Sequence, residues 1–479
     1  MHALIDVDRR RLLQIMGSGA LSLPFVGLPR FLKADEARPR VPPAPTADTL
    51  ILLWMSGGMA HTETFDPKTY VPFEVGMDPR KLICTFPAIP TSVDGIQFSA
   101  GLEHVAQVMD RGTLIRSFQA THLRPFSHSR ATYHWHTGYL PPISVDAPAI
   151  GAVIARILGP RKSAPDVPAN IDIGIEYEPE RIQHRTSGFL GPAYRPLVLQ
   201  DPYTANQNLL PRVGKERFKQ RHAAYLQFVK HGPLAKQAYA GQSDALVESV
   251  ETAYRFLQSP ASVAFDYTQE PDEVIKTYDT GRFGLGCLLA RRLTEAGARF
   301  ILVRQGNVHS IVNETFDSHG DGHVVYQKRK KEIDVPIAQL VKDLEIRGLL
   351  SRTLIVVASE FSRRVGVAGL EDDPLEDIKD AKQYGLHSHF TKAGSVLLFG
   401  GGIKQGHLYG KTNDVYPCEA VEKPVRIEDL HATIYRAMGI SAKHHFMIEQ
   451  RPFYVTRDGK GKPIKELFAD RVDLGTETL

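Results

Sequence analysis

Short apolar runs that end in polar turns recur along the chain and alternate with stretches of helical spacing. The first run, residues 49–55 (TLILLWM), stops at Ser56-Gly57-Gly58, which is typical of a buried strand followed by a turn. Runs of the same kind occupy residues 112–118, 298–304, 353–359 and 395–399. Apolar positions at helical spacing predict helices over residues 147–158, 281–296, 324–347 and 427–438. This alternation predicts an α/β fold with three layers, a mainly parallel sheet with helices on both faces.

The stretch from residue 203 to residue 267 breaks the alternation. It carries charged segments of helical spacing, at 215–230 and 244–258, and no strand signal. We therefore expect a helical insertion at 203–267, either as an excursion over one edge of the sheet or as a unit that folds separately. The chain has 479 residues, more than a single core usually supports, so we expect either one large domain with insertions or two domains. We assign residues 49–479 to one α/β domain that includes this insertion.

The N-terminus has the pattern of a twin-arginine export signal. Arg9, Arg10 and Arg11 directly precede a glycine-containing apolar stretch at 15–26, and a Pro-rich segment follows. The apolar stretch is shorter than the roughly 20 residues that span a bilayer. We expect a removable signal at 1–34, a linker at 35–48, no transmembrane span in the mature protein, and a periplasmic or otherwise exported location. The alternative is the amphipathic start of a cytosolic protein.

Composition and charge exclude several classes of function. Apolar residues make up 42% and charged residues 23% of the chain, which is ordinary for a globular protein and argues against a disordered or fibrous one. The net charge of +4 comes from mixed signs without a basic run, so we expect no nucleic-acid partner. Cys84, Cys287 and Cys418 form no CxxC pair, which argues against a zinc knuckle and leaves at most one disulfide with one free thiol. The sequence also lacks a GxSxG elbow, a Walker loop and a GxGxxG turn after a strand.

Polar residues that follow the predicted strands are the candidates for chemistry, because open parallel sheets place ligands beyond the carboxyl ends of their strands. Gly57 and Gly58 permit close backbone approach, and with Ser56 they are candidates for binding an anion through N–H groups.

Glu360 ends the fourth predicted strand, where a buried carboxylate must be paired, metal-bound or protonated. We assign it as a candidate metal ligand. The alternative is a salt bridge to Arg363 or Arg364.

The segment after the second predicted strand contains four histidines between His122 and His136. Imidazoles ligate metals or shuttle protons near neutral pH, and an arginine can bind a phosphate- or sulfate-like group through two hydrogen bonds. The catalytic candidates in this segment are Ser127, His128, Ser129 and Arg130. The alternative is that its histidines are structural.

Two more polar clusters flank the remaining predicted strands. Asp317 and His319 combine a carboxylate with an imidazole, a mixture that suits hard and borderline divalent cations. His389 belongs to an HSH segment before the last strand, and the glycines at 400–402 that end this strand permit another close approach to a ligand.

Six segments, in a fixed order between residues 49 and 438, carry a family resemblance. They are LWMSGGMAHTETFDPK, FDSH, SEF, HSHFTKAG, FGGGIKQGHLYGKT and DLHATI. Together they resemble an exported family, the domain of unknown function numbered fifteen-hundred-and-one, which is grouped with alkaline phosphatases and sulfatases. The resemblance implies an alkaline-phosphatase/sulfatase-like fold in which Asp317 and His319 form one ligand pair, Glu360 is the strand-end acid and His389 is the final histidine.

The chain departs from that superfamily at three places. Phe126 stands at the position of the sulfatase cysteine, so no formylglycine can form, and Phe361 stands where sulfatase-like enzymes carry histidine. The early double aspartate is replaced by Ser56-Gly57-Gly58. The resemblance therefore implies one divalent metal, with zinc, manganese and calcium as alternatives, or no cofactor.

We predict an extracytoplasmic, metal-assisted hydrolase of phosphate or sulfate esters, in which Arg130 offsets developing charge. Ser127 or Ser129 would be the nucleophile, with His128 as the neighbouring base. The alternative is a non-catalytic, sulfatase-like protein that binds a glycan, an anion or a protein partner. The expected ligand is a small-molecule ester or a glycan, and the sequence identifies no protein partner.

Overall fold

The computed structural model describes residues 35–36, 42–120, 127–141, 145–174, 187–207, 213–231, 240–306, 315–366, 376–470 and 472. The predicted signal at 1–34 lies outside these residues, as do His122 and Phe126. The export signal therefore stays a prediction.

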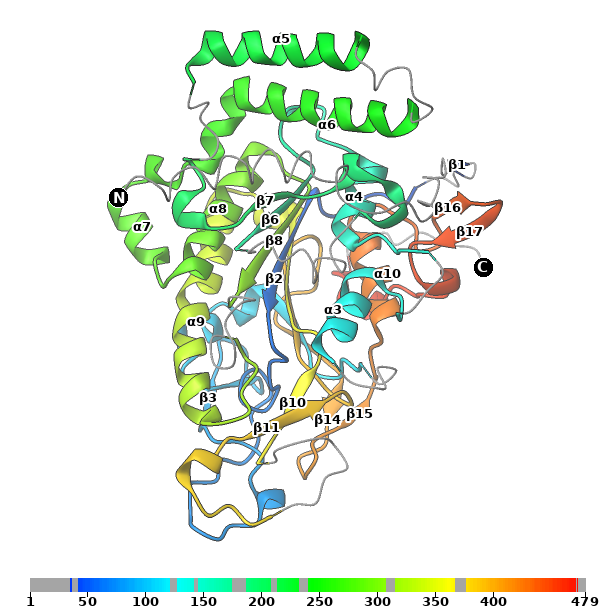
Figure 1. The fold of residues 1–479 in the computed structure, drawn as a ribbon. Helices are drawn as coiled ribbons and strands as arrows, with labels where there is room; N and C mark the ends of the chain where they lie inside the picture. Colours follow the sequence, from blue (N-terminus) through cyan, green and yellow to red (C-terminus); the bar gives the residue numbers. More distant parts are fainter. Residues whose placement is uncertain are drawn as a thin grey trace.

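An eight-stranded sheet forms the centre of the molecule (Figure 1). Its strand order is β13-β5-β12-β9-β2-β8-β6-β7. The strands are β2 (Thr49–Met55), β5 (Gly112–Ile115), β6 (Asn170–Ile173), β7 (Leu197–Leu199), β8 (Phe300–Gln305), β9 (Thr353–Ala358), β12 (Val396–Phe399) and β13 (His407–Tyr409). The five predicted strands all belong to this sheet, although the second one ends at Ile115, three residues before its predicted end.

One strand of the sheet runs against the others. β12 pairs in antiparallel register with both β5 and β9, whereas β2 is parallel to both β8 and β9. The residues before β12 therefore lie at the same sheet edge as the residues that follow β2, β8 and β9. The mainly parallel arrangement is confirmed, and this single reversal brings the HSH segment to the candidate site.

The alternation of side chains along β2 divides the core into two layers. Ile51, Leu53 and Met55 pack with helices α8 (Arg282–Ala296) and α9 (Gly322–Ile346) on one face. Leu50, Leu52 and Trp54 pack on the other face with helices α3 (His128–Thr137), α4 (Ile150–Leu158) and α10 (Ile427–Ala437). Figure 1 shows these two groups of helices on opposite sides of the strands. The three-layer fold predicted from the sequence is confirmed.

The predicted insertion at 203–267 contains the helices α5 (Lys215–His231) and α6 (Ala240–Gln258), and no strand among its described residues. In Figure 1 these helices lie at the end of the molecule opposite the hairpin of β10 (Ser362–Val365) and β11 (His387–Phe390). The insertion is therefore remote from that hairpin.

Two expectations from the sequence are corrected. The three cysteines are buried free thiols, so the disulfide left open by the sequence is not formed. The glycines at 400–402 follow the antiparallel β12, so they lie at the sheet edge opposite the candidate site. There a side chain at Gly400 would collide with the carbonyl oxygens of Leu350 and Thr353, so this turn serves close packing.

Candidate functional site

Four side chains from three separate segments meet at the carboxyl edge of the sheet. His128 is the first residue of α3, Asp317 and His319 lie in the segment between β8 and α9, and His389 lies on β11. Each offers one ligand atom, and these atoms all lie within 4.8 Å of one another. This group, called the His/Asp cluster below, contains three of the four metal ligands predicted from the sequence.

Asp317 is the anionic centre of the cluster. Its Oδ1 lies 2.9 Å from His319 Nε2, and its Oδ2 lies 3.4 Å from His128 Nε2. Burial opposes the charged carboxylate, but the hydrogen bonds from His128 and His319 and the charge of Arg363 outweigh it and hold the pKa of Asp317 well below its usual range. The side chain is therefore ionised at neutral pH.

Glu360 is not a member of the cluster, but its carboxylate orients His128. Its Oε1 accepts hydrogen bonds from His128 Nδ1 at 2.8 Å and from the Gly57 amide at 2.9 Å. Burial would raise the pKa of Glu360, yet the hydrogen bond and the charge of His128 outweigh it and lower this pKa. A carboxylate on one imidazole nitrogen fixes the ring and leaves the other nitrogen facing the site.

His128 is held between two carboxylates. Burial opposes its charged form, but the hydrogen bonds to Asp317 and Glu360 outweigh burial and raise the pKa of His128 to about 9. Both ring nitrogens are therefore engaged and protonated at neutral pH in the absence of a metal. In this state His128 has no free nitrogen to take a proton from Ser127 or Ser129.

The structure brings together two residues to which the sequence assigned different roles, and both roles stay predictions. His128, predicted as a catalytic base, lies within the His/Asp cluster, and Glu360, predicted as a metal ligand, holds His128 from behind. Sequence reasoning missed this because two residues 232 positions apart form the pair. The metal assignment itself stays a prediction.

His389 supplies the feature that fits a metal best. Its Nε2 is buried without a hydrogen-bond partner. Burial and the charges of Arg363 and His128 lower the pKa of His389 to about 3, so the ring is neutral and one of its two nitrogens carries a lone pair that can bind a metal. Three imidazoles and one carboxylate suit zinc or manganese, whereas calcium prefers oxygen ligands. The donor set therefore disfavours the calcium alternative.

A salt bridge from Glu360 to Arg363 or Arg364 was the alternative to a metal-ligand role, but the carboxylate partner of Arg363 in the structure is Asp317. The side chain is fully buried, and its Nη2 donates to Asp317 Oδ1. Residues alternate between the faces of a strand, so Arg363 shares one face of the β10–β11 hairpin with its cross-strand neighbour His389. In the sequence, the pair of arginines in SEFSRR was the available indication that a cation lies near the strand-end carboxylate.

The turn of Ser56, Gly57 and Gly58 packs closely against the segments that carry the cluster. A side chain at Gly57 would collide with the Asp317 backbone nitrogen, and one at Gly58 with the Phe361 ring. The Gly57 N–H already binds the Glu360 carboxylate, and the Ser56 hydroxyl accepts from Arg304 Nε at 2.8 Å. These two groups bind partners within the protein, and their binding of an external anion stays a prediction.

The first turn of α3 presents the remaining catalytic candidates. Ser127 is the N-cap, and its hydroxyl accepts from the Arg130 amide at 3.3 Å. Ser129 is exposed, and its Oγ lies 3.3 Å from Ser127 Oγ. The Nε of Arg130 is buried without a hydrogen-bond partner. Two hydroxyls and a guanidinium therefore lie at the N-terminus of the helix that begins with His128.

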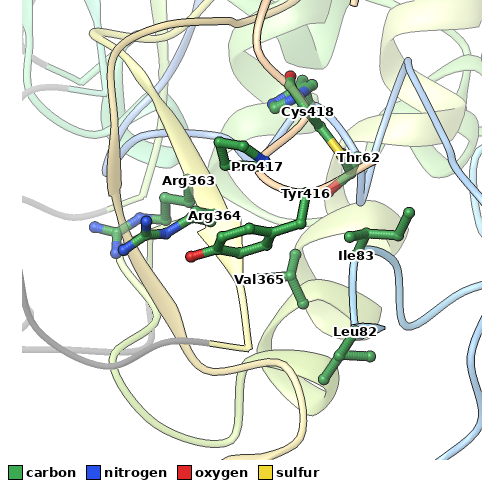
Figure 2. A pocket seen from close by; sticks show the side chains of 10 residues that line it. Thr62, Leu82, Ile83, Arg363, Arg364, Val365, Tyr416, Pro417 and Cys418 are labelled. Carbon is green, nitrogen blue, oxygen red and sulfur yellow. The ribbon is translucent and has the colours of Figure 1, made fainter. Parts of the chain in front are cut away.

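A small hollow lies against the same hairpin (Figure 2). Arg363 and Arg364 both line it, but their surroundings differ. The Arg364 guanidinium lies 5.3 Å from the centre of the Tyr416 ring, and its Nε donates to Ser388 Oγ at 3.3 Å. Arg363 donates into the His/Asp cluster through its bond to Asp317. Arg364 is thus a neighbouring arginine with different partners.

The model of the family described as Protein of unknown function (DUF1501) matches residues 47–468. The chain belongs to this family. The recognition made from its sequence segments is confirmed. A comparison with curated proteins found no match.

Solved structures that are similar to this chain include enzymes of three kinds. The lipoteichoic acid synthase LtaP from Listeria monocytogenes is 10% identical, with 90% of this chain and 79% of that chain covered and a TM-score of 0.35. The PsFucS1 sulfatase from Pseudoalteromonas sp. is 11% identical, with 84% and 68% covered and a TM-score of 0.33. The alkaline phosphatase from the Antarctic bacterium TAB5 is 11% identical, with 76% and 94% covered and a TM-score of 0.30.

At these identities, the chemistry of this DUF1501 protein has to be inferred from its own side chains. Within the described part of the chain, no helix combines the length and the apolar character that a membrane crossing needs.

Proposed function

We propose that this DUF1501 protein is a metal-dependent hydrolase of phosphate or sulfate esters that acts outside the cytoplasm. One observation carries the proposal. The His/Asp cluster gathers three imidazoles and a carboxylate, including the unpartnered His389 Nε2, beside the N-terminus of α3. Ligands of this kind, placed beyond the carboxyl ends of parallel strands, support a catalytic metal site.

The residues of the cluster would bind the metal ion, and Glu360 would position one of them. Asp317, His319 and His389 would hold the ion, with His128 as a fourth ligand once it has lost a proton. When bound, a divalent ion supplies Lewis-acid activation of an ester oxygen. Glu360 keeps the His128 ring in place through its bond to Nδ1.

The first turn of α3 would bind the reacting group. Arg130 offers a guanidinium to the phosphate or sulfate oxygens, and helix N–H groups favour an anion at this end. The hydroxyl of Ser127 or Ser129 is the candidate nucleophile, since both lie within this turn. A serine hydroxyl needs activation, and because His128 has no free nitrogen, a bound divalent ion would have to lower the pKa of the hydroxyl.

Location outside the cytoplasm is part of the proposal and rests on the arginines at 9–11 and the apolar stretch after them. Three buried free thiols are compatible with an oxidising compartment because each is covered by the fold.

A non-catalytic binding protein is the second candidate, and one observation favours it. Arg363 and the protonated His128 balance the two carboxylates Asp317 and Glu360, so the cluster is close to neutral without a metal. A site of this kind can persist as a polar pocket for an anion or a glycan.

Elemental analysis and an ester panel separate the two candidates. The protein is matured through its own export route, its zinc and manganese content is measured, and aryl phosphates and aryl sulfates are tested with each ion. We expect about one ion per chain and hydrolysis of at least one ester class, both lost in a His389→Gln variant. A folded protein without metal that hydrolyses none of these esters at any ion concentration would overturn the hydrolase proposal in favour of binding.

A further inference from the structure

Arg363 is a fully buried cation in contact with the candidate metal ligands. Besides its bond to Asp317, its Nε donates to the Gly57 carbonyl at 2.7 Å and its Nη1 to the His387 carbonyl at 3.3 Å. Its Nη2 also lies 3.3 Å from His128 Nε2. Its side chain has no exposed surface, so the guanidinium is fixed in place and is not available to an incoming substrate.

This position makes Arg363 a competitor of any ion that enters the cluster. The Asp317 carboxylate is the cluster's only anionic ligand, and the guanidinium already occupies its Oδ1. A guanidinium keeps its proton at every pH at which proteins fold, so its positive charge cannot be removed to admit a metal. Two cations held on one carboxylate repel each other, and burial of the Arg363 side chain keeps water from screening its charge fully.

We propose that Arg363 is a permanent cation of the His/Asp cluster, which limits the cluster to one divalent ion and weakens the binding of that ion. This inference rests on the proposed metal site but concerns the number of ions and their affinity rather than the reaction. Arg363 acts through Asp317, and it is therefore a positioning residue.

The neighbouring arginine provides a matched control. Arg364 lies on the same strand and is also buried, but it contacts Ser388 and the Tyr416 ring. Replacing either arginine removes one buried guanidinium from β10, whereas only the replacement of Arg363 removes the cation beside Asp317.

The test is a zinc titration of the full mature chain by calorimetry, with ions counted by native mass spectrometry. The variants are Arg363→Met, Arg363→Lys and Arg364→Met, each checked for folding by circular dichroism. We expect one ion in the wild type. Arg363→Met should bind zinc at least about tenfold more tightly or take up a second ion, while Arg363→Lys and Arg364→Met keep one ion at close to wild-type affinity. A folded Arg363→Met protein whose zinc affinity is unchanged or weaker overturns the proposal.

The wild type alone also tests the inference, should Arg363→Met not fold. Two ions per chain that are both lost in Asp317→Asn would show that the guanidinium does not limit the cluster. A single ion, lost in the same variant, supports the limit.

Failure of the proposed function gives a different pattern. A wild type without zinc and an Arg363→Met variant with one ion would mean that the guanidinium replaces the metal. The limit set by Arg363 would then stand, and the hydrolase proposal would fall.

Discussion

Arg363 and His389 face each other across the antiparallel β10–β11 hairpin, and both side chains reach the segment that carries Asp317. One of them is a fixed cation and the other is a neutral imidazole with a buried, unpartnered nitrogen. The hairpin thus presents to Asp317 both the group that competes with a metal and a ligand that would hold it.

Replacing Asp317 with Asn should remove bound metal, because the only carboxylate of the cluster loses its charge. It also leaves the buried Arg363 without an opposite charge, so we expect the free energy of unfolding to fall by about 3 kcal/mol. Elemental analysis and urea unfolding measure the two effects. The control is Asp321→Asn, an exposed carboxylate four residues further along the same segment. Equal metal content in the two variants would remove Asp317 from the site.

Glu360→Gln should leave the fold intact and weaken metal binding. The Gln oxygen still accepts from the Gly57 amide and from His128 Nδ1, but it no longer carries the charge that orients and polarises the ring. Losing such a partner typically reduces metal affinity by roughly 10- to 100-fold. Calorimetric titration with zinc measures the change. An affinity equal to that of the wild type would mean that His128 is not a ligand.

Ser127 and Ser129 can be separated by stability as well as by activity. Ser127→Ala removes the side-chain cap of α3 and should lower the free energy of unfolding by about 1 kcal/mol, whereas Ser129→Ala at an exposed position should change it little. Urea unfolding gives this comparison, and hydrolysis by the same two variants identifies the nucleophile. If both variants keep full ester hydrolysis, neither hydroxyl is the nucleophile.

Acid should destabilise the fold through His431. This residue is fully buried, its Nε2 donates to the Trp135 carbonyl, and burial lowers its pKa to about 4 from an ordinary 6.5. Between these two values the unfolded chain binds a proton that the folded protein does not, so stability falls as the pH drops from 6.5 towards 4, by about 3 kcal/mol for this one group. Urea unfolding at pH 7 and pH 5 should show a smaller loss in His431→Gln. Identical losses in wild type and variant would exclude His431 as a cause.

Replacing Arg9 and Arg10 with Lys should leave an unprocessed precursor in the cytoplasm, because the export receptor reads the guanidinium pair. Cell fractionation shows where the protein accumulates, and mass spectrometry of the N-terminal peptide shows whether the signal has been removed. An Arg11→Lys variant is the matched control. Normal recovery of the double variant outside the cytoplasm would contradict twin-arginine export.

The sequence predicted the sheet well because its central strands are continuous apolar runs. Residues 49–55 were placed without error, since a run that is buried on both faces needs no alternation to be recognised. The direction of β12 was not predictable, because a four-residue apolar run reads the same in a parallel and an antiparallel strand.

The site was predicted in part for a similar reason. Asp317 and Glu360 became candidates because polar residues that follow the strands of a parallel sheet lie near its ligand site. Their hydrogen-bond partners could not be predicted, because these come from segments that are distant in the sequence. The β10–β11 hairpin was missed because Ser362–Val365 contains two arginines and does not resemble a buried strand. Without that hairpin, neither the pairing of Arg363 with Asp317 nor the position of His389 can be inferred.

The central sheet ends in β7 and β13, each of which is three residues long. The outermost strand of a sheet exposes unpaired N–H and C=O groups, to which a strand of another molecule can add. Edge strands this short offer few hydrogen bonds to a strand of another molecule and hardly fix its register. A protein whose interior strands are this apolar is thereby protected from joining its sheet to that of a neighbour when many copies accumulate in a confined space.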